Sequence, residues 1–171
     1  MEQLQIKLLS DNATLPTRNH ATDAGFDIYA AETVVLEPQE KALIATDVAV
    51  NIPKGYVGLL TSRSGVSSKT HIVVETGKID AGFTGNMKIN IKNDSQMNAA
   101  IGPFGFGDYL NIEGEIITDT NCSIGKTYQI NKGDKLAQLL IVPIVTPELE
   151  QVEEFDSESE RGEKGFGSSG I

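Results

Sequence analysis

The chain has 171 residues, of which 39% are hydrophobic and 22% charged, a length and composition typical of one globular domain that buries its own core. Its formal net charge of −10 argues against direct binding of nucleic acid or of an anionic membrane, because both require a basic surface. There is no stretch of about 18 apolar residues, and Cys122 is the only cysteine, so no internal disulfide can form. We therefore expect a cytoplasmic protein that meets any polyanionic ligand locally, through a few cations, backbone N–H groups or a bound divalent ion.

Alternating and apolar runs predict short β-strands along most of the chain. The clearest runs lie at residues 3–9, 33–36, 42–52, 55–60, 86–93, 127–130 and 135–144. Within 86–93, Met87, Ile89 and Ile91 alternate with polar residues, which is the pattern of a half-buried strand. Only residues 65–72 leave room for a helix, of one or two turns. The sequence therefore predicts an all-β domain with at most one short helix.

Two polar segments in the first half of the chain are candidate ligand sites. Residues 23–27 place two small residues between two acids, which suggests a tight turn feeding a strand, and an acid such as Asp27 ordinarily caps such a turn. Residues 61–65 bring together Arg63, Ser64 and Gly65. A forked guanidinium, a hydroxyl and a permissive glycine can cradle a phosphate, although a polar loop is the default interpretation of so short a string.

Residues 77–85, with the sequence GKIDAGFTG, form the candidate active centre. The glycines indicate a tight hairpin, and Ile79 can anchor it from beneath. Asp80, held in the turn, can orient and partly deprotonate a water, while the ring of Phe83 can stack on a sugar or a base. The alternative is an ordinary surface hairpin, because such turns are common.

The strand pattern is lost in two places. Residues 94–126 have no strong period, but their aromatic residues favour a packed excursion over disorder. From residue 148 the chain is acidic and unpatterned until residues 165–170, whose glycines and hydroxyls could close over a triphosphate as a flexible lid. Gln138 is a polar amide within the apolar run 135–144 and needs a partner, either in the protein or in a substrate.

Five strings, in this order, resemble the five motifs of the homotrimeric dUTPase family. They are AGFD at 24–27, SRSG at 62–65, GKIDAGFTG at 77–85, GDKLAQ at 133–138 and RGEKGFGSSG at 161–170. The resemblance implies a β jelly roll assembled as a trimer, with active sites shared between subunits. It also implies one β domain at 1–147, interrupted by an insertion at about 94–126, and a flexible C-terminal arm at 148–171 that carries the closing motif.

The resemblance further implies hydrolysis of dUTP at the α-phosphorus to dUMP and pyrophosphate, with Mg²⁺ on the triphosphate, a reaction that keeps uracil out of DNA and supplies dUMP. Asp80 matches the acid that activates the water. Phe83 matches the ring that packs on deoxyribose and leaves no room for a 2′-hydroxyl. The hairpin backbone at Gly77, Lys78 and Ile79 would pair with the uracil edge.

The remaining motifs imply contacts with the phosphates and the metal. Arg63, Ser64 and Gly65 match the phosphate-binding trio, and Gln138 matches an amide that reaches the phosphate chain. Asp27 matches an acid that touches Mg²⁺ through water, which suits an ion that gives up its waters reluctantly. In the arm, Phe166 matches the ring that stacks on uracil. The residues that match the γ-phosphate clamp are Arg161, Gly167, Ser168 and Ser169.

The sequence departs from the family pattern at two positions. The family usually has tyrosine where Phe83 stands, so stacking is kept but a hydroxyl is lost, at a cost of about 1 kcal/mol. It often has an amide residue where this chain has Val74, so the backbone must supply those uracil contacts.

Two other functions are compatible with parts of the sequence. A dCTP deaminase shares the fold, but its glutamate acid/base would stand at Asn90, and an amide cannot shuttle the proton. Phage-encoded dUTPases can carry an insertion between the third and fourth motifs, and some bind repressor proteins. The 94–126 insert therefore predicts an additional or principal regulatory role by binding a repressor protein in the host cytoplasm, with Phe104, Phe106 or Tyr109 as interface anchors.

Overall fold

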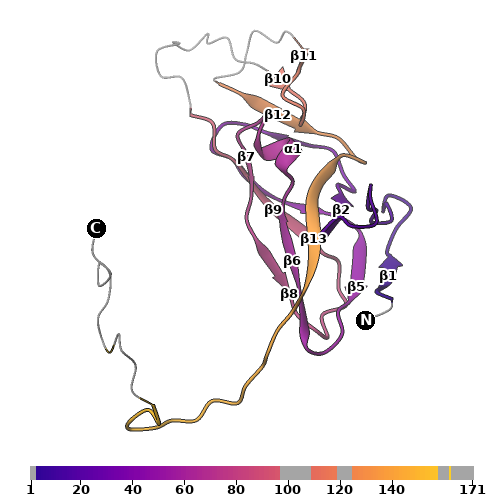
Figure 1. Cartoon of the computed structure of the whole chain (residues 1–171). Coiled ribbons are helices and arrows are strands. Elements are labelled where there is room, and N and C mark those ends of the chain that lie inside the picture. Colours follow the sequence, from indigo (N-terminus) through magenta and orange to yellow (C-terminus); the bar gives the residue numbers. More distant parts are fainter. Residues whose placement is uncertain (1–2, 97–108, 119–124, 158–161, 163–171) are drawn as a thin grey trace.

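The computed structural model describes residues 3–96, 109–118, 125–157 and 162 (Figure 1). The strands, in chain order, are β1 (Gln5–Leu8), β2 (Gly25–Tyr29), β3 (Val34–Leu36), β4 (Lys41–Ala45), β5 (Val48–Asn51), β6 (Tyr56–Ser62), β7 (Ile72–Val74), β8 (Gly77–Ile79), β9 (Lys88–Asn93), β10 (Tyr109–Leu110), β11 (Ile116–Thr118), β12 (Thr127–Ile130) and β13 (Lys135–Pro143). One helix, α1 (Ser64–Ser67), is found in this part of the chain, and it is too short to cross a membrane. The predicted all-β class with one short helix is confirmed.

The main sheet has the strand order β2-β13-β6-β8 and is antiparallel throughout. Strand β13 has a strand on each edge, and its apolar residues Leu136, Ala137 and Leu139 are buried in the core. The register sets Gln138 opposite Asp27 of β2 on one side and Thr61 of β6 on the other. The first, second and fourth motifs thus meet on neighbouring strands, and the third begins on β8.

A second sheet, β4-β9-β7, packs its inner face on the same hydrophobic core. Ile89 and Ile91 of β9 are fully buried, as is Ile44 of β4, whereas Asn90 between them is half-buried on the other face. The alternation predicted for residues 86–93 is therefore confirmed. Ile28, Leu136 and Leu139 of the main sheet belong to the same core cluster, so the two sheets enclose one core.

The run at residues 42–52 is not one strand, as the sequence suggested, but two strands in different sheets. Strand β4 pairs with β9, and β5 pairs with β1. The break lies at Thr46 and Asp47, and Asp47 has a φ of 52°, a left-handed conformation that interrupts a strand. Its carboxylate accepts hydrogen bonds from Ser10 Oγ and Asn86 Nδ2, at 2.5 and 2.7 Å, which hold the chain in this turn.

The described part of the insert extends the fold as part of a sheet. Strand β10 pairs in parallel with β12 and antiparallel with β11, giving the strand order β11-β10-β12-β3. Leu110 and Ile112 are buried in the same core cluster as residues of the two sheets described above. Tyr109 is half-buried, and its hydroxyl donates to Gln129 Oε1 at 3.1 Å, so it is held within the fold. The other two predicted anchors, Phe104 and Phe106, lie outside the described residues.

Candidate active site

The hairpin that follows β8 is anchored as the sequence predicted. Strand β8 pairs with β6, and the Ile79 side chain is buried in the core. Beyond it the chain turns: the Phe83 N–H donates to the Asp80 carbonyl at 3.1 Å, and Gly82 has a φ of 94°, which favours glycine. Asp80 is exposed, and Phe83 is 45% exposed. A carboxylate and a ring are thus presented to solvent on a turn fixed from beneath.

A pocket of about 290 Å³ lies against this hairpin. Asp80 and Phe83 line it, and so do three polar residues: Lys78, Asn86 and Lys88. From the sequence we assigned Lys78 only a backbone contact and did not name Asn86 or Lys88 as site residues. The two lysine cations can pair with the phosphates of a phosphate ester. The carboxylate can act as the base for a water that attacks the phosphorus. Asn86 is held in place by Asp47, because its Nδ2 donates to Asp47 Oδ1 and its Oδ1 accepts from the Asp47 N–H. The only sequence signal for Asn86 and Lys88 was their position directly after the hairpin.

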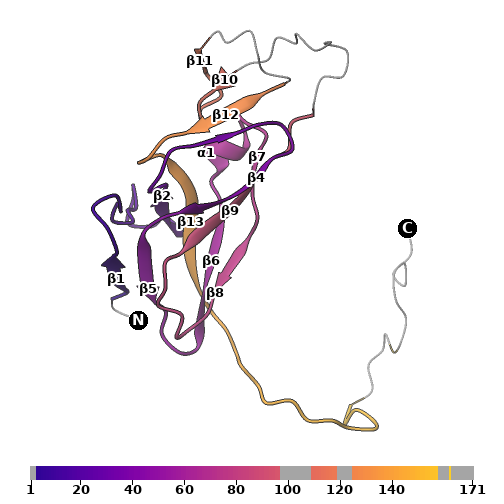
Figure 2. The ribbon, with the colours of Figure 1, turned by 180° about the vertical axis from the view of Figure 1, so that it is seen from behind.

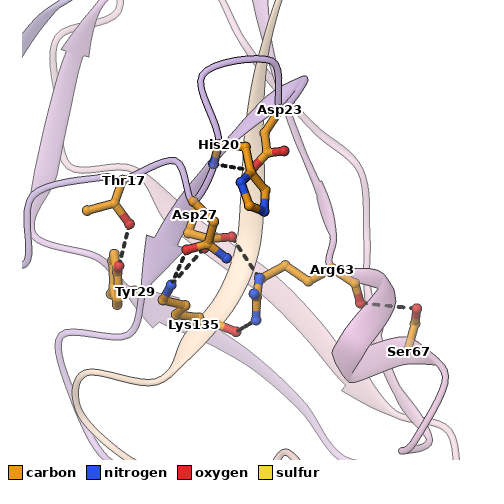
Figure 3. A network of polar contacts seen from close by, with 9 residues as sticks. Thr17, His20, Asp23, Asp27, Tyr29, Arg63, Ser67 and Lys135 are labelled. Carbon is orange, nitrogen blue, oxygen red and sulfur yellow. Dashed lines mark hydrogen bonds and ion pairs between the residues drawn. The ribbon is translucent and has the colours of Figure 1, made fainter.

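A second group of site residues is centred on the buried carboxylate of Asp27 (Figure 3). Its Oδ1 accepts from Arg63 Nε at 2.8 Å, and its Oδ2 lies 3.1 Å from Lys135 Nζ. Arg63 is held a second time by Nη1, which donates to the Lys135 carbonyl at 2.9 Å. Asp27 therefore lies within strand β2 and holds two cations, so the interpretation as an ordinary turn cap was wrong. Lys135 belongs to the fourth motif string, yet its role as a partner of Asp27 was missed.

The charges of this group keep Asp27 ionised. Burial raises the cost of charging the carboxyl, but the hydrogen bond from Lys135 and the charge and hydrogen bond of Arg63 outweigh it and hold the pKa of Asp27 below its usual range. The same hydrogen bond raises the pKa of Lys135. Two cations and one anion leave a net positive charge at this place in an acidic protein. A net positive charge within these three side chains is a condition that a phosphate ligand would need.

The other phosphate-site candidates lie beside this group. Arg63 is the N-cap residue of α1, and Ser64 and Gly65 begin the helix. A Cβ at Gly65 would meet no described atom within 4 Å, which leaves its backbone open to a ligand. Ser67 Oγ donates to the Arg63 carbonyl at 3.1 Å and ties the helix to its cap. Gln138, half-buried, lies opposite Asp27 in the register.

The two groups lie at opposite ends of β6. Ile79 of β8 pairs with Gly58 of β6, which places the next residue, Asp80, beside Val57. Arg63 lies six residues after Val57, at the other end of the extended strand β6. At about 3.3 Å per residue, the two backbones are about 20 Å apart. Figures 1 and 2 agree in placing α1 toward the upper end of the main sheet and the label of β8 toward its lower end. One chain does not bring the predicted base and the predicted phosphate cradle together.

Several predicted site residues cannot be placed by the structure. Arg161, Phe166, Gly167, Ser168 and Ser169 lie outside the described residues.

The described residues contain no cluster of three or more His, Cys, Asp or Glu side chains able to hold a metal ion. Each oxygen of Asp27 has one cationic partner and a second lone pair, which fits a contact with Mg²⁺ through water. The residues present therefore fit an ion that is bound mainly by substrate phosphates.

Comparisons with known proteins point to one family. The family model described as dUTPase matches residues 11–102 and 114–170. The deoxyuridine 5′-triphosphate nucleotidohydrolase of Debaryomyces hansenii is 36% identical over 171 residues, covering 99% of this chain and 88% of the relative.

Solved structures of phage proteins are more similar. The dUTPase of Staphylococcus bacteriophage 80alpha, solved with dUpNHpp, is 64% identical with a TM-score of 0.89, and each chain is covered completely. A mutant dUTPase from phage phi11 of S. aureus, described with a structural Mg(II) ion, is 65% identical with a TM-score of 0.81, covering 91% of this chain and all of the other. The jelly-roll-like fold predicted from the sequence is confirmed by this likeness.

Proposed function

The chain belongs to the dUTPase family of nucleotide hydrolases, and we propose that it converts dUTP to dUMP and pyrophosphate by attack of water on the α-phosphorus. The observation that carries this proposal is the pocket at the hairpin, where Asp80, Phe83 and two lysines converge. A carboxylate supplies the base, and the lysines offset the charge of the phosphates. The comparisons support the activity through the names of the relatives, which are dUTP hydrolases.

In this mechanism Asp80 accepts a proton from a water as the water oxygen bonds to the α-phosphorus. The bond between the α-phosphorus and the oxygen bridging to the β-phosphate breaks, and pyrophosphate leaves. Phe83 packs on deoxyribose and excludes a 2′-hydroxyl, while backbone groups at Gly77, Lys78 and Ile79 pair with uracil. Arg63 and Gln138 hold the phosphate chain.

We propose that the active site is shared within a homotrimer. The support is the separation of about 20 Å between the hairpin and the phosphate cradle within one chain. In a symmetric trimer the hairpin of one subunit can lie beside the α1 end of another, which would bring the base and the phosphate cradle into one site. The closing motif at residues 161–170 would complete the site over uracil and the γ-phosphate.

Mg²⁺ is the cofactor we propose, and it would arrive with the triphosphate. The ion would neutralise phosphate charge and fix the geometry of the phosphate chain. Asp27 is the residue we assign to it, through water, while the same carboxylate holds Arg63 and Lys135. The phi11 relative described with a Mg(II) ion supports magnesium as the metal.

A second role, binding a repressor protein through the insert, is favoured by one surface feature. Strand β11 pairs only with β10 among the described strands, and its Ile116 and Ile117 are 65% and 38% exposed. An edge strand with two exposed branched side chains suits a protein partner. The 80alpha dUTPase is described as controlling the transfer of virulence genes, which supports a regulatory role for a relative this similar, in the cytoplasm of the host.

Two experiments test these proposals. Pyrophosphate release from dUTP, dCTP, dTTP and UTP should occur with dUTP alone and should require Mg²⁺; ammonia released from dCTP would instead indicate the deaminase. For the second role, Ile116→Glu should weaken binding of a purified candidate repressor by calorimetry and leave dUTP hydrolysis unchanged. Equal binding by the variant and the unaltered protein would exclude β11 as the contact.

A further inference from the structure

The tip of the β10–β11 hairpin lies in close contact with the backbone of the segment that follows α1. Gly114, at this tip, has a φ of 79°, and a Cβ built on it would lie 2.7 Å from the backbone oxygen of Lys69. Real Cβ atoms essentially never approach so closely, and ordinary contact begins at about 3.4 Å. The hairpin backbone therefore lies directly against the Lys69 carbonyl, and only glycine fits there without displacement.

The hairpin is rigid on its own side of this contact. Asn111 Oδ1 accepts from the N–H groups of Glu113 and Glu115, both at 2.9 Å, and the Gly114 N–H donates to the Asn111 carbonyl. Leu110 and Ile112 anchor it in the core cluster that also contains Val66 of α1. Because the tip is fixed by its turn and its base by burial, a shift at Gly114 would be passed mainly to Lys69 rather than absorbed by the hairpin.

On the other side, Lys69 is coupled to the phosphate cradle through one short helix. The Lys69 N–H donates to the Val66 carbonyl, and the N–H groups of Val66 and Ser67 donate to the Arg63 carbonyl. The next residue but one, His71, is held as well, because its N–H donates to the Tyr128 hydroxyl at 3.1 Å. Strand β12, which carries Tyr128, is itself paired with β10. Figures 1 and 2 place α1 and the hairpin at the same end of the molecule.

We propose that Gly114 is a positioning residue for triphosphate binding: the insert hairpin supports the C-terminal end of α1 and thereby sets the position of Arg63, Ser64 and Gly65. This inference rests on the proposed phosphate-binding role of α1. The insert is then part of the catalytic scaffold, in addition to any partner that its outer edge binds. A partner that displaced the hairpin would change phosphate affinity through the same contact.

The test compares two glycines with similar positive φ values, of which only Gly114 lies against a neighbouring backbone. Gly114→Ala adds a methyl group against Lys69, whereas Gly55→Ala, at a φ of 81° with no described atom within 4 Å of its Cβ, carries the same backbone strain and no clash. Gly114→Asn is the second variant, since Asn tolerates a left-handed conformation and keeps the clash. The affinities of dUpNHpp, which has the phosphates, and of deoxyuridine, which lacks them, are measured for each full-length variant together with the unfolding temperature.

We expect Gly114→Ala and Gly114→Asn to bind dUpNHpp about tenfold more weakly, because the Lys69 carbonyl must move by about 0.7 Å to restore ordinary contact, and displacements near 1 Å at a binding site are costly. Deoxyuridine binding should stay unchanged, and Gly55→Ala should bind both ligands normally. An equal loss of both ligands would show a general structural effect and overturn the proposal. So would normal dUpNHpp binding by Gly114→Asn. Arg63→Ala tests the phosphate site itself: if this variant binds dUpNHpp normally, the proposed phosphate-binding role of Arg63 is wrong. This result is distinct from failure of the positioning role proposed for Gly114.

Discussion

Replacing Asp27 by asparagine should destabilise the protein through the loss of one buried charge. The variant keeps the shape of the side chain but leaves Arg63 and Lys135 without their counter-ion, at present 2.8 and 3.1 Å away. The Asp27 side chain is 5% exposed, and the cations are 21% and 34% exposed. Breaking a fully buried pair costs about 3–5 kcal/mol, and the partial exposure of both cations reduces this to about 2–3 kcal/mol. For a domain of this length the unfolding temperature should fall by about 5–10 °C.

The same variant gives a pH test with a defined sign. The pKa of Asp27 is lower in the folded state than its ordinary value of 3.8. Its contribution to stability is therefore complete above about pH 4 and is lost as the pH falls through the lowered pKa. The difference in unfolding temperature between the two proteins should be constant from pH 7 to 5 and shrink below pH 3.8.

Circular dichroism on heating, at one protein concentration, measures both effects. Glu75→Gln is the control, because Glu75 is also ion-paired, with Lys41 at 2.5 Å, but both side chains are about half exposed. Its unfolding temperature should stay within about 2 °C of the unaltered protein. An Asp27→Asn protein that unfolds like the control at pH 7, or a difference that does not shrink in acid, would refute the structural role assigned to this carboxylate.

Three further predictions concern catalysis. Asp80→Asn should lower kcat at least 10³-fold, as expected for loss of a base, with dUpNHpp affinity unchanged by calorimetry; substantial residual turnover would move the base elsewhere. Truncation before Arg161 should cut kcat/KM for dUTP strongly while the unfolding temperature stays the same, and a truncated enzyme as active as the full chain would exclude the closing motif. Phe83→Ala should raise the kcat/KM of UTP relative to dUTP by about tenfold or more, because the ring that excludes the 2′-hydroxyl is gone; an unchanged ratio would show that discrimination lies outside this ring.

Local patterns predicted the elements whose burial follows a simple period. Strand β9 shows this, because the alternation of Ile89 and Ile91 with polar residues matches burial on one face. The anchoring of the hairpin by Ile79 was predictable for the same reason: it is the one branched apolar side chain next to the turn. The short helix was expected within residues 65–72 and is found at Ser64–Ser67, so its existence was predicted but its end was not.

Features that depend on tertiary contacts could not be predicted in the same way. The break at Asp47 is stabilised by Ser10 and Asn86, which lie 37 and 39 residues away in sequence, so no window around residues 42–52 contains its cause. Strands β10 and β11 are two and three residues long, and they exist because β12 provides a pairing edge and the core buries Leu110. The role of Lys135 requires the register of β13 against β2, which sequence alone does not give.

The shared active site is tested most directly by mixing two inactive variants. Asp80→Asn and Arg63→Ala are each expected to be inactive, and they are unfolded, mixed in equal amounts and refolded into trimers. If Asp80 and Arg63 of one site come from different subunits, about one quarter of the sites receive both intact residues by random assembly. The account predicts about a quarter of the activity of the unaltered enzyme in the mixture. Activity no higher than that of the separate variants would contradict it, because the two residues would then have to act within one chain.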